Sequence, residues 1–301
     1  MEKLQWERLD IHQRLDIAID FPALAVQHNF WNEMDYQWWT CVLVDYPQLA
    51  EYCDKWEIMD GGQWACILEN SPQFADRYQC DWDKFDGDNW SRVLAKQPQF
   101  AKYCKWEKLN GRDWTFLLMA QPQFAAYCDF SQIDKWGMLL HQMPQFIEKC
   151  PLEERMKWHD SFWATLVADW PKLAAYCNWQ GFTGESWSLL LQKQPEFADA
   201  CSWDTLTGSD WTELLLKQPK FADRCNWKLL DGGLWSYLLQ TRPQMASHCQ
   251  WEKLDGNDWV WLLLAQPQFG DNCDWENWMA AIGANSSRSN LSGPNSVTGR
   301  N

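Results

Sequence analysis

The sequence holds few of the residues on which catalytic and metal sites are built. Histidine occurs five times, without a recurring partner at a fixed spacing. No glycine-rich nucleotide loop, G-x-S-x-G elbow, H-E-x-x-H motif or zinc-type C-x-x-C pair is present. We therefore expect a protein that is not an enzyme and that holds no cofactor and no metal.

Long apolar runs and an excess of basic residues are also lacking. No stretch approaches the ~18 apolar residues of a membrane span, and no N-terminal run resembles a signal peptide, so no membrane association is expected. Asp and Glu outnumber Lys and Arg by 41 to 26, which gives a net charge of −15. Nucleic-acid affinity comes mainly from neutralising phosphates, so direct nucleic-acid binding is not expected. Another protein with a basic surface is the partner that this charge favours.

What the chain does contain is a repeat of about 24 residues. Its phrase reads W-x-x-L-L-x-x-Q-P-Q-F-A-x-x-C-x-W-x-x-L-x-G. A period of this length is typical of a solenoid, in which each unit packs only on the next. Most of the 25 tryptophans are in register and are therefore assigned to the core. The periodic prolines are Pro22, Pro47, Pro72, Pro98, Pro122, Pro144, Pro171, Pro195, Pro219, Pro243 and Pro267.

Within one repeat the pattern predicts a helix, a break and a second short helix. Trp114 and the two leucines after it lie at i, i+3 and i+4, on one face of a helix. We expect Asp113 to cap this helix and Gly111 to occupy a turn with a positive φ angle. The helix should end before Pro122, which suits the first turn of the second helix. The remaining Trp–Leu–Gly link is short enough for a 3-10 turn.

The predicted fold is all-α, a right-handed α-solenoid of about ten short helix-turn-helix repeats with 3-10 or turn links. Short strands are the alternative, but the apolar residues do not alternate, and a proline in every repeat would interrupt a ladder. In its period and its alternation of helices the chain resembles α-solenoids of the leucine-rich-variant type, which alternate an α-helix with a 3-10 helix. The resemblance implies the fold alone.

Three segments are expected along the chain. Residues 1–31 match the repeat poorly and predict an N-terminal capping helix or degenerate repeat. Residues 32–283 hold the Trp/Cys-rich array. Residues 284–301, rich in Ser, Asn and Gly, predict a disordered tail or an expression remnant. The residues expected to close the last unit are Trp275, Trp278, Met279 and Ile282.

The centre of the array, residues 129–163, departs from the rhythm. Pro122 and Pro144 are 22 residues apart, Pro144 and Pro171 are 27 apart, and the insert after Cys150 has no counterpart. A drifted repeat explains this irregularity, and a bend or docking site is the functional alternative. An enzyme with an unusual site here is a further hypothesis. Such a site would use His141, His159, Glu153 and Glu154.

Ten of the twelve cysteines occupy one repeat position. Equivalent residues in stacked repeats sit about 8–10 Å apart, whereas a disulfide needs Cα atoms within about 7 Å. We expect reduced thiols that fill small apolar spaces, which favours a reducing, cytoplasmic setting. The ten are Cys53, Cys80, Cys104, Cys128, Cys150, Cys177, Cys201, Cys225, Cys249 and Cys273.

Candidate binding residues are those that the packing leaves free. The position two residues after each helix tryptophan changes chemistry from repeat to repeat and lies off the apolar stripe, so we expect it to be exposed. A second row lies beside the periodic cysteines, where tyrosines either contact a partner or cover the side of the stack. The candidates from the two rows are Phe116, Tyr237 and Trp261, and Tyr52, Tyr78, Tyr103, Tyr127 and Tyr176.

Two further polar patterns are noted. The glutamine after each proline is expected to make hydrogen bonds between repeats. An acidic turn superficially resembles a calcium loop but lacks its spacing and closing glutamate, so a solvated turn on the binding surface is expected. Its residues are Asp81, Asp83, Asp86 and Asp88.

Two functions follow from these patterns. The first is a non-enzymatic protein-binding scaffold that uses an extended acidic and aromatic surface. The alternative is an acidic mimic of nucleic acid, of the kind that a phage or mobile element encodes, which inhibits a nuclease or another nucleic-acid-binding defence protein. Residues 1–100, with 8 Lys/Arg against 18 Asp/Glu, favour the mimic, whereas the interspersed Lys and Arg weigh against it.

Overall fold

The computed structural model describes residues 3–275, and within that range the regular structure is helical, without a strand. The chain divides into two compact units, Met1–Glu154 and Arg155–Asn301. In both units an α-helix of about ten residues is followed by a shorter helix and a link, at a spacing of about 24 residues. This confirms the predicted α-solenoid, while its handedness stays a prediction. None of the helices between residues 3 and 275 could cross a bilayer.

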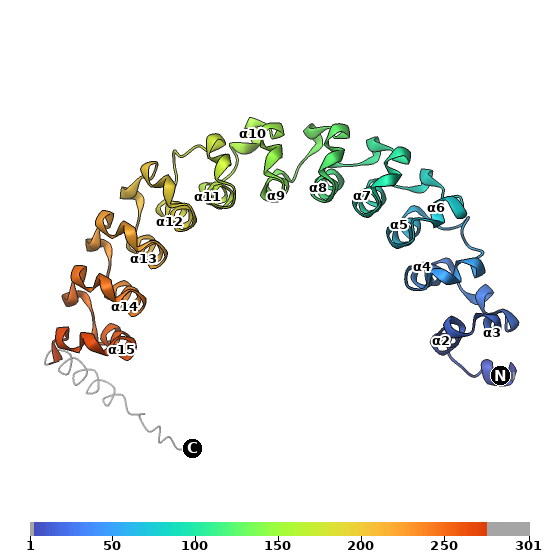
Figure 1. Ribbon diagram of the computed structural model, residues 1–301, viewed down its shortest axis with the longest axis horizontal. Coiled ribbons are helices and arrows are strands. Elements are labelled where there is room, and N and C mark those ends of the chain that lie inside the picture. Colours follow the sequence, from blue (N-terminus) through green and yellow to red (C-terminus); the bar gives the residue numbers. More distant parts are fainter. Residues whose placement is uncertain (1–2, 276–301) are drawn as a thin grey trace, which may run out of the picture. The chain divides into compact units, whose positions relative to one another are not determined.

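In unit 1 the longer helices lie side by side along one edge and the shorter helices along the other (Figure 1). The longer helices are α2 (Ile11–Asp20), α4 (Tyr36–Asp45), α5 (Gly61–Asn70), α7 (Gly87–Lys96), α8 (Gly111–Ala120) and α9 (Trp136–Gln142). Their shorter partners are α3 (Pro22–Gln27), η2 (Pro47–Tyr52), α6 (Phe74–Arg77), η4 (Pro98–Tyr103), η6 (Pro122–Tyr127) and η8 (Pro144–Lys149). The links contain α1 (Lys3–Trp6), η1 (Phe30–Glu33), η3 (Trp82–Lys84), η5 (Trp106–Lys108) and η7 (Phe130–Gln132).

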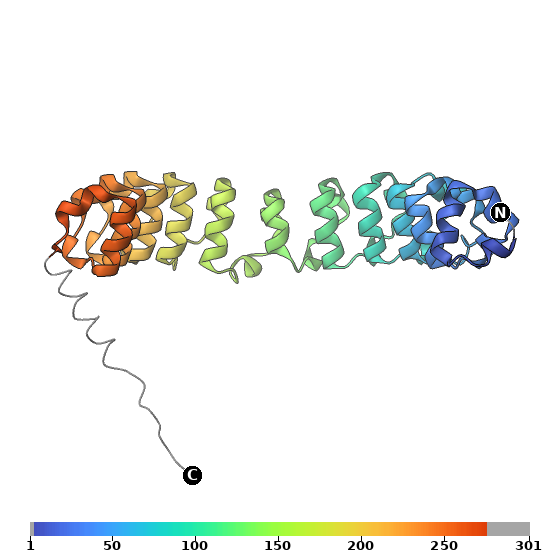
Figure 2. The ribbon, with the colours of Figure 1, turned by 90° about the horizontal axis from the view of Figure 1, so that it is seen from below.

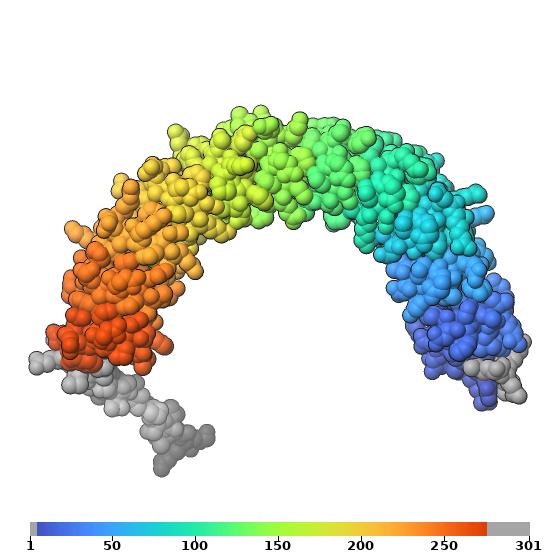
Figure 3. All heavy atoms as spheres, in the orientation of Figure 1, coloured from blue at the N-terminus to red at the C-terminus, as the bar shows by residue number. Residues whose placement is uncertain are grey.

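Unit 2 repeats this arrangement, and its longer helices stand next to one another in chain order (Figure 2). They are α11 (Asp160–Asp169), α12 (Gly184–Lys193), α13 (Gly208–Lys217), α14 (Gly232–Thr241) and α15 (Gly256–Ala265). Their partners are η9 (Pro171–Tyr176), η10 (Pro195–Asp199), η12 (Pro219–Arg224), η14 (Pro243–His248) and η16 (Pro267–Asn272), with links η11 (Trp203–Thr205), η13 (Trp227–Leu229) and η15 (Trp251–Lys253). The space-filling view shows that the colours of each unit follow one another without mixing, so repeats contact their sequence neighbours (Figure 3).

The second short helix that the sequence pattern predicted after each proline is a 3-10 helix in most repeats. The Cys104 N–H donates to the Ala101 carbonyl at 3.1 Å, which is an i→i−3 bond. Six residues that begin with proline offer few i→i−4 bonds against the cost of nucleating an α-helix. The tighter 3-10 geometry therefore prevails, except in α3 and α6.

Two predictions about the start of the longer helix were wrong, namely the placement of Asp113 at the N-cap and the positive φ angle of Gly111. Asn110 is the N-cap of α8, and Asp113 is the third helical residue, whose carboxylate accepts from the Asn110 N–H at 3.0 Å. Gly111 is the first residue of the helix and has no positive φ angle. Side chains of the same kind cap the other helices, namely Asp60, Asp86, Thr183, Thr207, Asp231 and Asp255.

The periodic glycine is required by close packing between repeats. A Cβ atom at Gly111 would overlap the carbonyl oxygen of Gln132 in the next link, and one at Gly87 would lie 2.5 Å from the Lys108 carbonyl oxygen. Gly61, Gly184, Gly208 and Gly232 meet the equivalent carbonyls in the same way. Any side chain at this position would push the following repeat away.

In the five repeats where glutamine precedes the proline, that glutamine, rather than the residue after the proline, joins neighbouring repeats. Gln121 Nε2 donates to the Ala95 carbonyl of α7 at 2.7 Å, which satisfies an acceptor at the end of that helix. Gln123 Nε2 donates to Gln121 Oε1 at 2.7 Å, so the glutamine after the proline supports its neighbour within the repeat. The same inter-repeat bond is made by Gln97, Gln194, Gln218 and Gln266, and by the guanidinium of Arg242.

Lysines in the links make a second set of inter-repeat bonds. Lys84 Nζ donates to the carbonyls of Glu57 and Met59 at 2.7 and 2.8 Å, and both acceptors lie in the preceding repeat. Lys253 Nζ makes the equivalent bonds to Lys228 and Leu230. These lysines are therefore structural, and part of the interspersed positive charge belongs to the framework.

The twelve cysteines are free thiols, and burial raises the pKa of eight of them to about 12. A shift from 9 to about 12 lowers the thiolate fraction roughly 1000-fold, and the thiolate is the nucleophile. The eight are Cys53, Cys80, Cys104, Cys128, Cys177, Cys201, Cys225 and Cys249.

We expect iodoacetamide at pH 8 to alkylate the folded protein first at Cys41, which is exposed. The eight periodic thiols should react at least about 100-fold more slowly than they do in urea, because folding lowers both their thiolate fraction and their accessibility. Intact-mass spectrometry over time would count the modifications. Uniform labelling of all twelve thiols in the folded protein would contradict this expectation.

The irregular centre contains the boundary between the two units, within α10 (Leu152–Arg155). After it, α11 begins with Asp160, where the helices α5, α7, α8 and α12 to α15 begin with glycine. Asp160 Oδ2 accepts from the Thr183 N–H and hydroxyl at 2.8 and 2.7 Å. Burial alone would raise the pKa of Asp160, but these hydrogen bonds outweigh it and lower that pKa to about 2. The following link contains Gly181 at a φ of 91° instead of a 3-10 helix, so the loss of glycine in α11 is accompanied by a different link.

The N-terminal end of the array lies within the described residues, whereas most of the segment after η16 does not. Residues 3–33 form a repeat in which Trp6 stacks on His28, with ring centroids 4.8 Å apart, and Arg14 takes the place of the helix tryptophan. The predicted tail at 284–301 lies outside the described residues. So do Trp278, Met279 and Ile282, which were expected to close the last unit.

Candidate functional site

The strongest candidate for a binding surface is the row of residues two positions after each helix tryptophan, called the helix-face row. Its aromatic members are exposed as predicted, with Phe116 and Tyr237 each 48% exposed and Trp261 64% exposed. The tryptophans that precede them are buried, so the same helices present one ring to the core and one to solvent. The row contains Cys41, Cys66, Arg92, Phe116 and Met138 in unit 1, and Thr165, Leu189, Glu213, Tyr237 and Trp261 in unit 2.

The row in unit 1 includes an ion cluster that the sequence analysis missed. Arg92 Nη2 donates to Glu69 Oε1 at 2.6 Å and lies 3.3 Å from Cys66 Sγ. Lys96 Nζ pairs with the other oxygen of the same carboxylate at 2.8 Å. Glu69 and Arg92 are 23 residues apart, close to one repeat, so a search for opposite charges at that spacing could have found the pair.

The tyrosine row covers the link tryptophans. Tyr103 stacks on Trp82 with centroids 4.9 Å apart, and Trp82 stacks in turn on the buried Trp90 at 5.3 Å, so three rings form one column. In other repeats Arg224 lies over Trp203 and His248 over Trp227. A flat or cationic group at this position is therefore part of the packing of the repeat. The other tyrosine–indole pairs are Tyr52 on Trp31, Tyr78 on Trp56 and Tyr127 on Trp106.

Tyr176 is the tyrosine of this row that lies in unit 2. The Arg155 guanidinium lies 5.6 Å from the centre of its ring. A cationic group beside a tyrosine ring is a favourable contact, so Tyr176 also contributes to packing within its repeat.

The acidic turn consists mainly of capping carboxylates. Asp81 accepts from the Asp83 N–H at 3.1 Å and caps η3, and Asp86 accepts from the Asn89 N–H at 2.9 Å and caps α7. Asp83 pairs with Lys105 at 2.5 Å, and this hydrogen bond and charge lower the pKa of Asp83. Asp88 is exposed in the first turn of α7, where a negative charge is favourable. Within residues 3–275 no cluster of three His, Cys, Asp or Glu could hold a metal ion.

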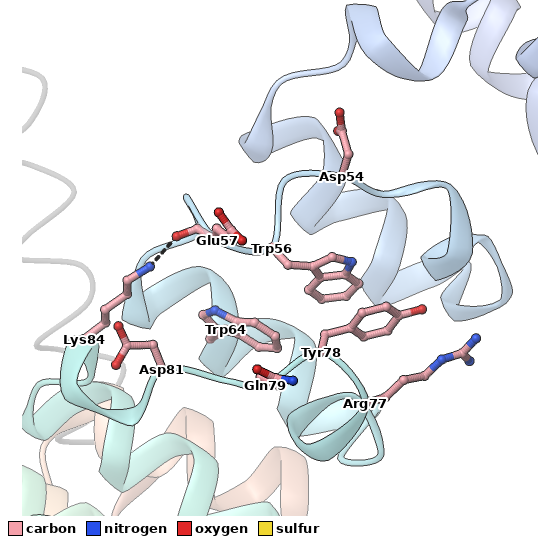
Figure 4. A pocket seen from close by; sticks show the side chains of 9 residues that line it. All are labelled: Asp54, Trp56, Glu57, Trp64, Arg77, Tyr78, Gln79, Asp81 and Lys84. Carbon is pink, nitrogen blue, oxygen red and sulfur yellow. Dashed lines mark hydrogen bonds between the residues drawn. The ribbon is translucent and has the colours of Figure 1, made fainter.

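One cleft in unit 1 contains two of the predicted binding residues, Tyr78 and Asp81 (Figure 4). The spacing from Pro72 to Cys80 is eight residues, against six in most repeats, and the extra length forms α6. Gln79 then adopts a left-handed φ of 51°, and the Cys80 N–H donates to the Ala75 carbonyl, as in a Schellman cap. The cleft has a volume of about 550 Å³ and is lined by Asp54, Trp56, Glu57, Trp64, Arg77, Tyr78, Gln79, Asp81 and Lys84.

The chemistry of this cleft suits a cationic side chain. The exposed carboxylates Asp54, Glu57 and Asp81 surround a column of three aromatic rings. Of the two basic groups in the lining, Lys84 is held by the carbonyls of the preceding link, and the Arg77 guanidinium lies 5.3 Å from the centre of the Tyr78 ring. A guanidinium or ammonium from a partner would meet these carboxylates there and could form charge-assisted hydrogen bonds with them.

The residues of the enzyme hypothesis do not line this cleft. His141 belongs to α9, Glu153 and Glu154 belong to α10, and His159 is the N-cap residue of α11. Glu154 is half-buried, and the other three are exposed. Catalysis in the irregular centre stays a hypothesis.

Comparison of the chain with protein-family models, with curated proteins and with solved structures returned no match in any of the three.

Proposed function

We propose that the chain is a non-enzymatic scaffold that binds another protein through the helix-face row. The observation that carries the proposal is the exposure of the aromatic residues in this row. The framework tryptophans are buried, and the glycine, glutamine and link lysine positions make inter-repeat contacts. The row instead changes chemistry along the chain, and its aromatic members Phe116, Tyr237 and Trp261 are open to solvent. Exposed Tyr and Trp are the residues that most often dominate binding energy.

The partner is expected to present a basic surface. The net charge of −15 favours such a partner over long range, and the cleft at Tyr78 offers carboxylates to a cationic side chain at close range. Association should therefore slow as salt concentration rises. Aromatic contacts at Phe116, Tyr237 or Trp261 would be affected less by salt, because they depend on buried apolar area.

Mimicry of nucleic acid is the less favoured candidate. Several carboxylates that produce the acidic charge are occupied as helix caps, including Asp60, Asp86, Asp231 and Asp255. Others are neutralised locally, as Asp83 is by Lys105 and Glu69 by Arg92. A mimic should be displaced from its target by duplex DNA, so competition with DNA separates the two candidates.

We expect a variant carrying Phe116→Ala, Tyr237→Ala and Trp261→Ala to lose at least tenfold in the capture of its partners. The matched control changes three exposed apolar residues outside the row, Ile58→Ala, Leu152→Ala and Met156→Ala, and should capture as the wild type does. Affinity capture with quantitative mass spectrometry measures the difference, and circular dichroism checks the fold of each variant.

Two results would contradict the proposed function. Failure of the wild-type protein to capture any specific partner at micromolar concentration would argue against a binding scaffold. Equal capture by the helix-face variant and the control would show that the row is not the binding surface.

A further inference from the structure

The outer side of α15, facing away from α14, is apolar and open in the described part of the chain. Val260 is 42% exposed and Leu264, four residues later on the same side of the helix, is 74% exposed. The residues equivalent to Val260 in earlier repeats are covered, with Ser236 3% and Thr212 1% exposed. The exposure of Val260 therefore marks a place where another segment belongs.

The inner repeats show what covers this side. The Ser236 hydroxyl donates to the Asp258 carbonyl of the next helix at 2.8 Å, and Ser188 donates to the Asp210 carbonyl at 2.9 Å. This position thus faces the repeat that follows. Ala65 and Ala164 hold the same position in earlier repeats and are 0% exposed, so an apolar side chain is also covered there. Val260 therefore suits an apolar contact with the segment that follows.

The residues that follow η16 in the sequence include several apolar ones, and η16 packs against α15, so they can supply this apolar contact. Trp275 takes the position of a link tryptophan, two residues after Cys273, and its Nε1 donates to the Gly270 carbonyl at 3.0 Å. The next residues carry Trp278 in the place of the buried link residue Leu254, followed by Met279 and Ile282. These apolar residues recur at three and four positions, as on one side of a helix.

We propose that residues 276–283 bind the outer side of α15 over Val260 and Leu264 and so form the C-terminal cap of unit 2. The segment has the length of one link and about one helical turn, which suits an end piece. A solenoid needs such a piece because its last repeat otherwise exposes a stacking surface. Trp261 belongs to the helix-face row and not to this surface, since the equivalent Tyr237 is exposed although a repeat follows it.

The first test compares three chains that end at Asn301, Gly283 and Trp275. The first two should melt within about 1 °C of each other and show equal hydrogen exchange in α15. The chain ending at Trp275 should lose at least tenfold in the protection of α15 amides and melt several degrees lower. It should also self-associate as its concentration rises, because Val260 and Leu264 would then be uncovered.

The second test adds the segment back. A synthetic peptide of residues 274–284 should bind the chain ending at Trp275, with a change in tryptophan fluorescence and recovery of α15 protection. Val260→Asp in that chain should weaken peptide binding at least tenfold, and Trp261→Ala should leave it unchanged. This comparison separates capping from a general loss of folding.

Two results would overturn the proposal. One is unchanged exchange and melting in the chain ending at Trp275. The other is a full-length chain that is dimeric at micromolar concentration and becomes monomeric with Val260→Asp, since a second copy would then cover α15. Neither result depends on partner capture by the helix-face row, so the proposed function is tested separately.

Discussion

Replacing Gly232 by alanine is expected to destabilise unit 2 by about 2–3 kcal/mol. A Cβ atom there would overlap the Lys253 carbonyl oxygen and an oxygen of Asp258, and would lie 3.0 Å from the Leu254 Cα. Two of these three contacts are backbone atoms of the next repeat, so no side-chain rotation relieves them. The measurement is the midpoint of urea unfolding together with its slope.

The neighbouring residue of α14 provides the control. A Cβ atom at Gly233 would meet nothing closer than 3.6 Å, so Gly233→Ala should be neutral or stabilising by up to about 1 kcal/mol through helix propensity. Gly61→Ala and Gly62→Ala form the same pair in unit 1. Equal effects at Gly232 and Gly233 would show that the glycine is retained for some reason other than the approach of the next link.

Trp114→Ala is expected to destabilise unit 1 by about 3–5 kcal/mol, the usual range for a buried aromatic residue. Trp114 is 2% exposed and stacks on Trp106 with ring centroids 5.5 Å apart. Truncation would leave a cavity beside the column of rings, and the framework cannot collapse into it because the next repeat is held by its own hydrogen bonds. Chemical denaturation followed by circular dichroism measures the loss.

Phe116→Ala is the matched control, because Phe116 lies two residues later on the same helix and is 48% exposed. It should change the stability by less than about 1 kcal/mol. The two variants therefore distinguish Trp114, whose ring stabilises the fold, from Phe116, whose ring is proposed to contact a partner. A large loss of stability in Phe116→Ala would assign that residue to the core and remove it from the proposed binding surface.

The fold could be predicted from the sequence because the repeat displays its packing directly. Periodic tryptophan and leucine mark the buried side of each longer helix, and proline marks its end. Two details could not be read in this way. Gly111 was predicted to be a turn residue because the sequence of one repeat does not reveal which atoms of the next repeat lie against it. In the structure, a side chain at Gly111 would overlap the carbonyl oxygen of Gln132 in the next repeat. The role of Gln121 is likewise visible only beside the Ala95 carbonyl.

The candidate site was predictable in part. Variation at one position beside a constant framework identified the exposed Phe116, Tyr237 and Trp261. For the tyrosine row the sequence left two alternatives open, contact with a partner or packing against the repeat. The stacking of Tyr103 on Trp82 decides for packing, and it depends on distances in space that residue numbers do not provide. The cleft at Tyr78 arises from two extra residues and a left-handed Gln79, which a sequence period records only as an irregular interval.

The inter-repeat contacts have a consequence for how such a chain can change its length. In the regular repeats of α12, α13 and α14, each block of 24 residues carries a glutamine or arginine that reaches back one block and a glycine that lies against a carbonyl of the block ahead. Removal of residues 208–231 would join Thr207 to Gly232, and Arg242 would then face the carbonyl that Gln218 now binds. Duplication or excision of whole blocks therefore preserves every junction, so unequal recombination within the gene can yield longer or shorter proteins without inventing a new interface.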